Sequence, residues 1–551
     1  MSHQSRSRAG WAAAAVLAWL VGYPLVITLL EALGLPESFT LEHFLEFASG
    51  ADEWRALWQS LWISTASTIL AGAVGVPLAF IFERLGFPGR RILGSLIALP
   101  VALPPLVGVI AFLFLYGESG FVARGLQQWL NLPRAPWRLS GAVAILLVHA
   151  YSMYVYFYLF TRAALARLDA SLEEAAAALG AGRWRRLRRV TLPILLPAMA
   201  GAALLTFMTS LGSFSAPYIF GGSFRVMTTQ IMASKLNGEI AMAQVETVTL
   251  AVMAFCGLWA MRRIDPGSTA VVGGVRGISP TRRELRRPLA RWGAALAGWG
   301  LALFLLLPHL TLLLISFVPP GTWTVELVPP VLDGSNYASL VTTPERLRPV
   351  LNSLWMATVA TVGAVALGLT AARLSVRAGG RLGRMLETLV TVPWALPGTV
   401  FAMALATTFA VHAPLAGRFV LVGTPWLLPL AYLVRSLPLT GRSALAGLRQ
   451  FDPSLEEAAA SLGAGRWRRL RRVVLPLLRP AVMAGASLAF ITALGDFVTS
   501  IVIYTFDTRP ISIEILSSLR LQETGVAAVY GVLLVLVSGT AFVIWGRDQR
   551  A

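Results

Sequence analysis

The sequence predicts an all-α integral membrane protein of about twelve transmembrane helices, arranged as two parallel six-helix repeats with both termini in the cytoplasm. Three observations support this prediction: an apolar composition, the placement of the arginines and an internal repeat. Hydrophobic residues make up 56% of the 551 residues and charged residues 13%, against roughly 45–50% and 25% in ordinary globular proteins. Most of the chain is therefore expected to lie in lipid.

Runs of apolar residues define the expected spans, since about 20 such residues are needed to cross the hydrocarbon core. The first run follows Arg6 and Arg8 and is expected to stay as an uncleaved anchor, because it is long for a signal peptide and no clean cleavage site closes it. The twelve runs are Trp11 to Leu30, Leu61 to Phe82, Ile92 to Tyr116, Gly141 to Phe160, Leu195 to Phe214, Thr247 to Met261, Gly293 to Phe317, Leu354 to Ala372, Leu389 to Val411, Phe419 to Val434, Pro480 to Ile503 and Gly525 to Trp545.

Basic residues orient these spans. With the N-terminus inside, 35 of the 46 basic residues fall on the cytoplasmic side, as the positive-inside rule expects. The net charge of +19 therefore reflects membrane topology and contact with lipid, and no nucleic-acid partner is expected. The cytoplasmic segments are 1–10, 83–91, 161–194, 262–292, 373–387, 435–479 and 546–551.

A direct repeat divides the chain. Residues 169–197 and 452–480 differ at five of 29 positions, and weaker matches at the same spacing or close to it continue on both sides. Each half holds six spans, an even number, so both copies have the same orientation in the membrane. We expect a first repeat at 1–261, a cytoplasmic linker at 262–292 that carries eight arginines, and a second repeat at 293–551.

Each repeated block lies between the fourth and fifth spans of its half. Asp452 and Pro453 are typical of a helix start, and Ser454 with Glu457 offers an alternative capping-box register. A run of helix-forming residues follows, and glycines at 180, 182, 463 and 465 are expected to end the short helix in a sharp turn. A second, basic helix, Arg183 to Val190 or Arg466 to Val473, is expected to lead into the next span.

The blocks resemble the EAA loop of type I ABC importer permeases, in which Glu-Glu-Ala-Ala is followed by Leu-Gly and further on by Leu-Pro. We name residues 169–197 the first EAA loop and residues 452–480 the second. In that family the short helix of the loop docks in a cleft of a separate ATPase subunit and couples its closure to the membrane. The resemblance gives this ATPase-coupling role to Glu173, Glu174, Ala175 and Gly180, and to Glu456, Glu457, Ala458 and Gly463.

No nucleotide-binding P-loop is present in the sequence. Such a loop needs Gly-Lys-Ser/Thr, and Lys235, the one lysine, lies between Ser234 and Leu236. We therefore expect a transport subunit that is not itself an enzyme, has no cofactor and works with two copies of an ABC ATPase subunit that bind ATP. An external solute-binding protein is the other expected partner, and the expected location is the bacterial cytoplasmic (inner) membrane.

A candidate solute path is expected around Asp496, the one acid that falls inside a predicted span, because ionisable groups in a span are functional candidates by default. Its repeat counterpart is Ser213, and Phe214 and Phe497 follow the two residues. One carboxylate among hydroxyls suits a cation or a hydrogen-bonding solute. The alternative is that Asp496 bonds to the backbone or to Ser500. The histidines have no partners at ligand spacing, so no metal site is expected.

The Pro-rich segments Pro100/Pro104/Pro105 and Pro393/Pro397 should interrupt the third span of each repeat. The fused arrangement of twelve spans with two EAA loops most resembles that of ferric-iron importers, so ferric iron is the first candidate solute. Polyamine, thiamine, sulfate and aminoethylphosphonate remain alternatives. A major-facilitator-type secondary transporter also has two six-span halves, and the basic segment from Glu83 to Arg91 supports that reading.

Overall fold

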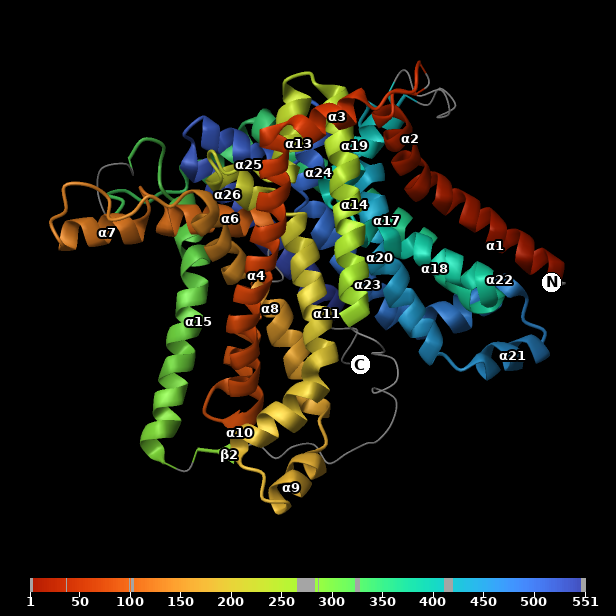
Figure 1. Ribbon diagram of the computed structural model, residues 1–551, viewed down its shortest axis with the longest axis horizontal. Helices are drawn as coiled ribbons and strands as arrows, with labels where there is room; N and C mark the ends of the chain where they lie inside the picture. The colour runs from red at the N-terminus through yellow and green to blue at the C-terminus, as the bar shows by residue number, and fades with distance from the viewer. Residues whose placement is uncertain are drawn as a thin grey trace. The chain divides into compact units, whose positions relative to one another are not determined.

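The protein is built from α-helices (Figure 1). The computed structural model describes residues 3–35, 37–98, 100, 104–264, 283–285, 287–322, 328–410 and 420–546. The chain forms two compact units. Unit 1 contains Met1–Ser49, Ile231–Ala251 and Ile315–Ala551, and unit 2 contains Gly50–Gln230 and Val252–Leu314.

Unit 2 holds spans two to five of the first repeat, and its long helices α4, α8 and α11 pack along one another. Buried aromatic residues fill its core, among them Phe82, Tyr154 and Tyr158. A pair of two-residue parallel strands, β1 and β2, lies beside these helices. The elements are α4 Ala51–Arg84, β1 Leu85–Gly86, α5 Arg90–Leu96, α6 Pro105–Tyr116, α7 Phe121–Trp129, α8 Gly141–Arg167, α9 Ala170–Ala178, α10 Arg183–Arg186, the π-helical turn Leu187–Thr191, α11 Leu192–Leu211, α12 Ser215–Phe220 and β2 Arg283–Glu284; α13 Met227–Leu236, α14 Ile240–Ile264 and α15 Pro288–Ser316 belong to both units.

Unit 1 holds spans two to six of the second repeat, in which α17 packs along α20 and α23. The arrangement matches that of α4, α8 and α11 in unit 2, as expected for a direct repeat. The elements are α1 His3–Leu17, the π-helical turn Ala18–Gly22, α2 Tyr23–Ala32, α3 Glu42–Ser49, α16 Ser335–Thr342, α17 Pro344–Ala378, α18 Gly380–Ala395, α19 Gly398–Thr408, α20 Leu427–Gln450, α21 Pro453–Ser461, α22 Arg466–Arg469, the π-helical turn Leu470–Val474, α23 Leu475–Leu494, α24 Val498–Ile503, α25 Ile511–Arg520 and α26 Thr524–Gly546.

The first helix of each repeat packs with the other repeat. Helices α1 and α2 contact α17, α18 and α19 within unit 1, and the Trp19 and Phe409 rings meet edge to face at 5.8 Å. Most of α15 belongs to unit 2, where Tyr151 donates a hydrogen bond to the carbonyl of Leu305 at 2.6 Å. The compact units therefore differ from the predicted ranges 1–261 and 293–551. Most of the predicted linker 262–292 lies outside the described residues.

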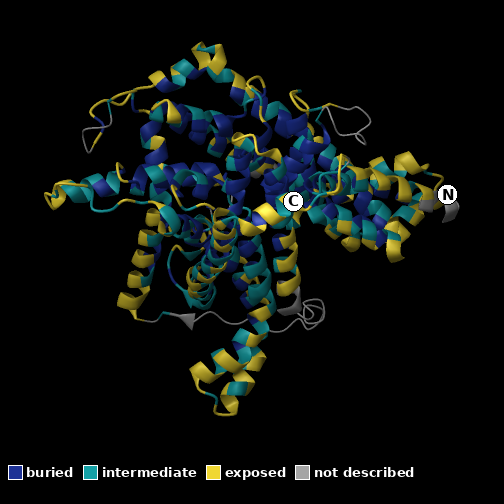
Figure 2. Ribbon diagram, turned by 45° about the horizontal axis from the view of Figure 1, so that its top comes forward, coloured by how far each residue is buried: buried dark blue, intermediate teal, exposed yellow. Residues whose placement is uncertain are grey.

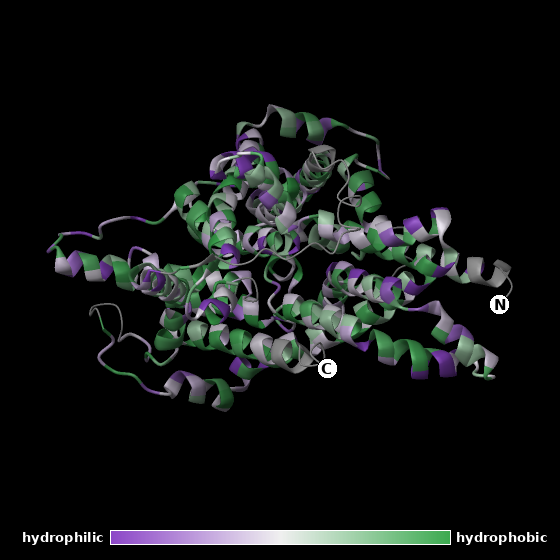
Figure 3. Ribbon diagram, turned by 90° about the horizontal axis from the view of Figure 1, so that it is seen from below, coloured by the Kyte–Doolittle hydropathy of each residue, from purple (hydrophilic) through white to green (hydrophobic). Residues whose placement is uncertain are grey.

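Ten helices in the described part of the chain are long and apolar enough to cross a membrane, and the bent pair of α18 and α19 raises the number to eleven. The tenth predicted span, Phe419 to Val434, corresponds to α20, which begins at Leu427 and continues to Gln450. Arg435, which the predicted topology assigns to the cytoplasmic segment 435–479, is the ninth residue of this helix. Many large hydrophobic residues of these helices are exposed, as expected for helix surfaces that face lipid (Figures 2 and 3).

The third and fifth spans of the second repeat are broken, and so is the fifth span of the first repeat. The predicted interruption at Pro100/Pro104/Pro105 falls partly on residues that lie outside the described ones. The prediction of a break at Pro397 is confirmed, since α18 and α19 meet there at 108°. The fifth spans are broken too, which the sequence analysis did not predict: α11 and α12 are separated by residues 212–214, and α23 and α24 by residues 495–497. Ser213 and Asp496 therefore lie in helix breaks, where backbone groups need partners from the protein.

Candidate functional site

The EAA loops form the short helices that the sequence predicts (Figure 1). In α9 the Asp169 carboxylate accepts a hydrogen bond from the Ser171 backbone N–H at 3.0 Å. In α21 Asp452 accepts from the N–H of Ser454 at 2.9 Å. The aspartate register is thus the one adopted, with Pro453 in the first turn. The basic segments that follow run through a π-helical turn into α11 and α23.

Glycine ends each short helix because the turn needs a left-handed backbone. Gly180 has a φ of 76° and Gly463 a φ of 79°, a region that β-branched residues strongly resist. A Cβ at either position would meet no other atom. The requirement for glycine is therefore one of backbone angle and not of space.

The first glutamate of each Glu-Glu pair is tied to the end of span two. Arg84, the last residue of α4, makes a two-pronged ion pair with Glu173 at 2.6 and 2.9 Å, and Thr191 donates to the same carboxylate at 2.7 Å. In unit 1 Glu456 pairs with Arg373 at 2.8 Å and also with Arg377.

These contacts change the acidity of both glutamates. Burial raises the pKa of Glu173, but the hydrogen bonds from Arg84 and Thr191 outweigh it, so the pKa lies below the ordinary value. Burial likewise raises the pKa of Glu456, and its arginine partners again lower it more. Both carboxylates are therefore ionised at neutral pH, which the ion pairs require.

The remaining predicted coupling residues are exposed. Glu174, Ala175 and Gly180 of the first loop and Glu457, Ala458 and Gly463 of the second all face solvent. Large apolar side chains accompany them: Leu179 is 89% exposed and Leu462 88%. Trp184 and Trp467 are both 71% exposed. Each loop thus exposes the same kinds of apolar and acidic side chains.

Ser213 belongs to a polar cluster centred on His149, a histidine for which no metal site was expected and whose hydroxyl partners the sequence did not predict. Nε2 of His149 hydrogen-bonds with the Ser213 hydroxyl at 3.0 Å, and Nδ1 with the hydroxyls of Ser67 at 2.9 Å and Ser210 at 3.1 Å. Thr228 donates to the carbonyl of Ser213 at 2.8 Å. The cluster satisfies the polar groups of the break between α11 and α12.

Asp496 is held in a denser set of contacts in unit 1. One carboxylate oxygen accepts from the Thr499 backbone N–H at 2.8 Å. The other accepts from the Thr499 hydroxyl at 3.0 Å and lies 3.2 Å from Nη1 of Arg435. Asp496 therefore bonds to backbone groups and to Ser500, as the alternative interpretation of the sequence expects, and it has an arginine partner that the sequence did not predict. Phe214 and Phe497 are buried in their own units.

A Ser-Leu-Trp motif in the second span of each repeat contacts the helix that follows the broken fifth span. Ser60 accepts a hydrogen bond from the Met227 N–H, and Ser353 accepts one from the Ile511 N–H, each at 2.8 Å. Both donors lie at the start of the helix that follows the broken span. The sequence match of this motif was visible, but its role follows only from the fold.

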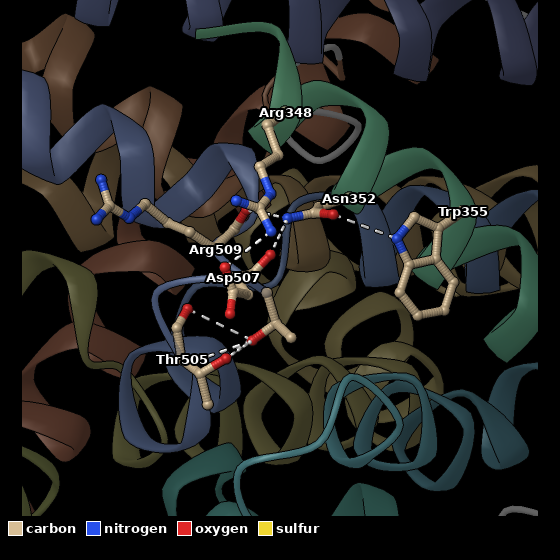
Figure 4. Close-up of polar contacts among 7 residues, drawn as sticks. Arg348, Asn352, Trp355, Thr505, Asp507 and Arg509 are labelled. Carbon is tan, nitrogen blue, oxygen red and sulfur yellow. Dashed lines mark hydrogen bonds and ion pairs between the residues drawn. The ribbon is translucent and has the colours of Figure 1, made fainter. Parts of the chain in front are cut away.

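In unit 1, Asn352, which precedes Ser353, hydrogen-bonds to the turn between α24 and α25 (Figure 4). Its side-chain amide donates to the carbonyls of Asp507 at 2.9 Å and Arg509 at 3.1 Å. Arg348 pairs with the Asp507 carboxylate at 2.8 Å, and the Trp355 indole N–H donates to the side-chain Oδ1 of Asn352 at 3.3 Å. The N-terminal part of α17 and the broken fifth span are thereby joined.

Comparison with known proteins agrees with the two repeats. The family described as "Binding-protein-dependent transport system inner membrane component" matches residues 75–269 and 364–547, and each match contains one EAA loop. The chain is 30% identical over 535 residues to the "Probable ABC transporter permease protein y4fN" of Sinorhizobium fredii, covering 96% of this chain and 94% of that one.

Two further relatives carry names that specify a solute. The chain is 25% identical to the "Ferric transport system permease protein FbpB" of Actinobacillus pleuropneumoniae, covering 94% of this chain and 74% of that one. It is 28% identical to the "Putative 2-aminoethylphosphonate transport system permease protein PhnV" of Salmonella paratyphi A, over 48% of this chain and 96% of that one.

Proposed function

Because the chain belongs to the family of binding-protein-dependent transport system inner membrane components, we propose that it forms the solute path of an importer driven by two separate ATPase subunits. It is an ABC transporter permease, a transport subunit of the inner membrane. The alternative of a major-facilitator-type secondary transporter is wrong, since both repeats match the permease family.

The duplicated EAA loop is the observation that carries the proposal. Two loops of nearly identical sequence expose equivalent leucine and tryptophan side chains and end in the same left-handed glycine. A pair of identical docking surfaces fits two copies of one partner subunit. Each surface is tied to span two by an ion pair, so movement of the docked helix is passed to the membrane helices through Arg84 or Arg377.

Co-purification tests the assembly. The full chain, extracted in mild detergent, should carry two ATPase copies per permease, counted from the mass of the intact complex. Replacing Leu179 and Leu462 by aspartate should abolish ATPase binding while the chain remains in the membrane. Retention of both copies by this double variant would contradict the docking assignment, and a reproducible single copy would contradict the two-site assignment.

Ferric iron is the proposed solute, supported by the similarity to a ferric transport permease along most of the chain. The relative named for 2-aminoethylphosphonate matches one half of the chain and supports a second candidate. Both termini are proposed to face the cytoplasm, with an external solute-binding protein on the opposite side. Uptake of radiolabelled iron and phosphonate by the complete transporter decides between the two solutes.

A further inference from the structure

Arg435 lies inside a helix at a position where the first repeat has an uncharged residue. It is the ninth residue of α20. The equivalent position of the first repeat, at the same spacing of 283 residues as the EAA loops, is Ser152, which donates to the Val148 carbonyl of its own helix at 2.9 Å. Asp496 likewise corresponds to Ser213. Since the same fold forms with two serines, the ion pair is a specialisation of the second repeat.

The Asp496 carboxylate is already saturated. Its two oxygens receive the N–H and hydroxyl of Thr499, the N–H of Ser500 at 3.4 Å and the Arg435 guanidinium. A carboxylate offers about four lone-pair sites, so little capacity is left for a cation. The negative charge is compensated by the arginine and two backbone groups.

The guanidinium, in contrast, keeps free donors. Arg435 has five N–H groups, and only Nη1 is engaged, with the Thr499 hydroxyl at 2.9 Å and with Asp496. In the part of the chain that the structure describes, neither Nη2 nor Nε has an acceptor. One quarter of the side chain remains exposed. Free guanidinium donors are costly in lipid, so they are suited to a polar solute or to water.

Two broken spans leave space for this guanidinium. Gly398 begins α19 directly after the 108° bend, and a Cβ at this position would overlap Nη1 of Arg435. Helix α24, which follows the break at Asp496, contacts both α19 and α20. The arginine thus occupies the place where both interruptions of the second repeat meet.

We propose that Arg435 binds an oxyanion group of the transported solute. The proposal rests on the proposed importer function and specifies its solute class: a phosphonate, or a metal ion carried in an anionic carboxylate chelate. A guanidinium recognises both groups through paired hydrogen bonds. Iron would then cross as an anionic chelate and not as a bare cation.

The test uses the full chain with its ATPase and binding protein in proteoliposomes supplied with ATP. The probes are 2-aminoethylphosphonate, ferric citrate, spermidine and thiamine. The wild type should accumulate one of the two oxyanion probes. Arg435→Gln should lower that uptake at least about tenfold, because the charge-assisted hydrogen bonds are lost, and Arg435→Lys should give an intermediate rate.

Three further variants complete the test. Arg442→Gln, two turns along α20 and stacked over Trp394, should leave uptake unchanged. Asp496→Asn should keep most of the uptake, since it removes no group that binds the solute. The double variant Arg435→Ser/Asp496→Ser reproduces the pair that the first repeat already folds with, so it should co-purify with the ATPase and still lose uptake.

Uptake at the wild-type rate by Arg435→Gln or by the double-serine variant would overturn the inference. Accumulation of spermidine or thiamine alone would also overturn it. A loss of uptake in Asp496→Asn without a loss in Arg435→Gln would do the same. The proposed importer function would still stand after each of these results. Failure of the wild type to accumulate any probe with ATP would overturn the proposed function and this inference with it. Phosphonate and ferric citrate distinguish the two sources of the oxyanion.

Discussion

Replacing Glu173 by glutamine should loosen the short helix α9 from the end of span two. The change removes the negative charge that Arg84 and Thr191 hold at 2.6–2.9 Å. Arg84 is 24% exposed and Glu173 21%, so the pair lies between the exposed and buried cases. We expect a loss of about 2 kcal/mol, between the values typical of exposed and of buried ion pairs.

Hydrogen exchange measures this loss directly. A change of about 2 kcal/mol corresponds to a roughly 30-fold increase in the opening equilibrium, so amides 170–178 of the chain in nanodiscs should exchange faster by up to that factor. Arg84→Gln should have a similar effect, and the double variant should exchange little faster than either single one, because both changes break the same contact.

Glu174→Gln is the matched control, since this neighbouring glutamate is exposed and the same chemical change should leave exchange as it is. Equal exchange in Glu173→Gln and Glu174→Gln would refute the reasoning, as would additive effects of the Glu173 and Arg84 variants. In the second loop Glu456 has two arginine partners, so Arg377→Gln alone should have a smaller effect than Arg84→Gln.

The same contact should depend on pH in one direction. The pKa of Glu173 is lower in the folded protein than its ordinary value, so the folded state binds its proton less tightly than the unfolded chain does. The stabilisation is therefore complete above the ordinary glutamate pKa and is lost as the pH falls through the lowered one. Corrected for intrinsic exchange, protection of α9 should be constant near neutral pH and fall in acid, and Glu173→Gln should remove that dependence.

Other predictions concern coupling, energy source and capping. Gly180→Val and Gly463→Val should each raise the number of ATP molecules hydrolysed per solute imported, because valine resists the left-handed turn; wild-type ratios in both variants would exclude the coupling role. Uptake by the reconstituted complex should require ATP and withstand a protonophore at constant ATP, and sensitivity to the protonophore would contradict ATP-driven import. Asp169→Ala and Asp452→Ala should each destabilise the first turn of α9 or α21 by about 1 kcal/mol, seen as faster exchange of the Ser171 or Ser454 amide, and unchanged exchange would show that the caps contribute nothing.

Local signals made the EAA loops predictable from the sequence. The aspartate caps and the terminating glycines act within a few residues of the helices they define, and their duplication at a constant spacing confirmed the pattern. The ion pairs of Glu173 and Glu456 were not predicted, because their arginine partners are distant in the sequence. Arg84 lies 89 residues before Glu173, and Arg373 and Arg377 lie 83 and 79 residues before Glu456. The corresponding positions of Arg84 and Arg377 in the two repeats were the one available signal.

Long-range contacts explain why the surroundings of Asp496 could not be predicted. Asp496 was not paired with Arg435 because this arginine falls in the predicted cytoplasmic segment 435–479. An arginine beside an apolar run commonly marks the cytoplasmic end of a span. The helix continues to Gln450 because α17 and α23 pack against it, which no local pattern reveals. The breaks around Ser213 and Asp496 were hidden by the apolar residues that flank them.

The exchange of first helices sets an order of assembly during synthesis. Helices α1 and α2 are synthesised before their partners, because Trp19 meets Phe409 roughly 390 residues later, a delay of about 20–80 s at about 5–20 residues per second. Helix α15, by contrast, joins helices that are already made. A nascent chain of 320 residues therefore includes every segment of unit 2. At that stage α17, α18 and α19, the partners of α1 and α2, have not yet been synthesised. We therefore expect α1 and α2 to need an insertase or lipid contacts that keep them from the wrong partners during this interval.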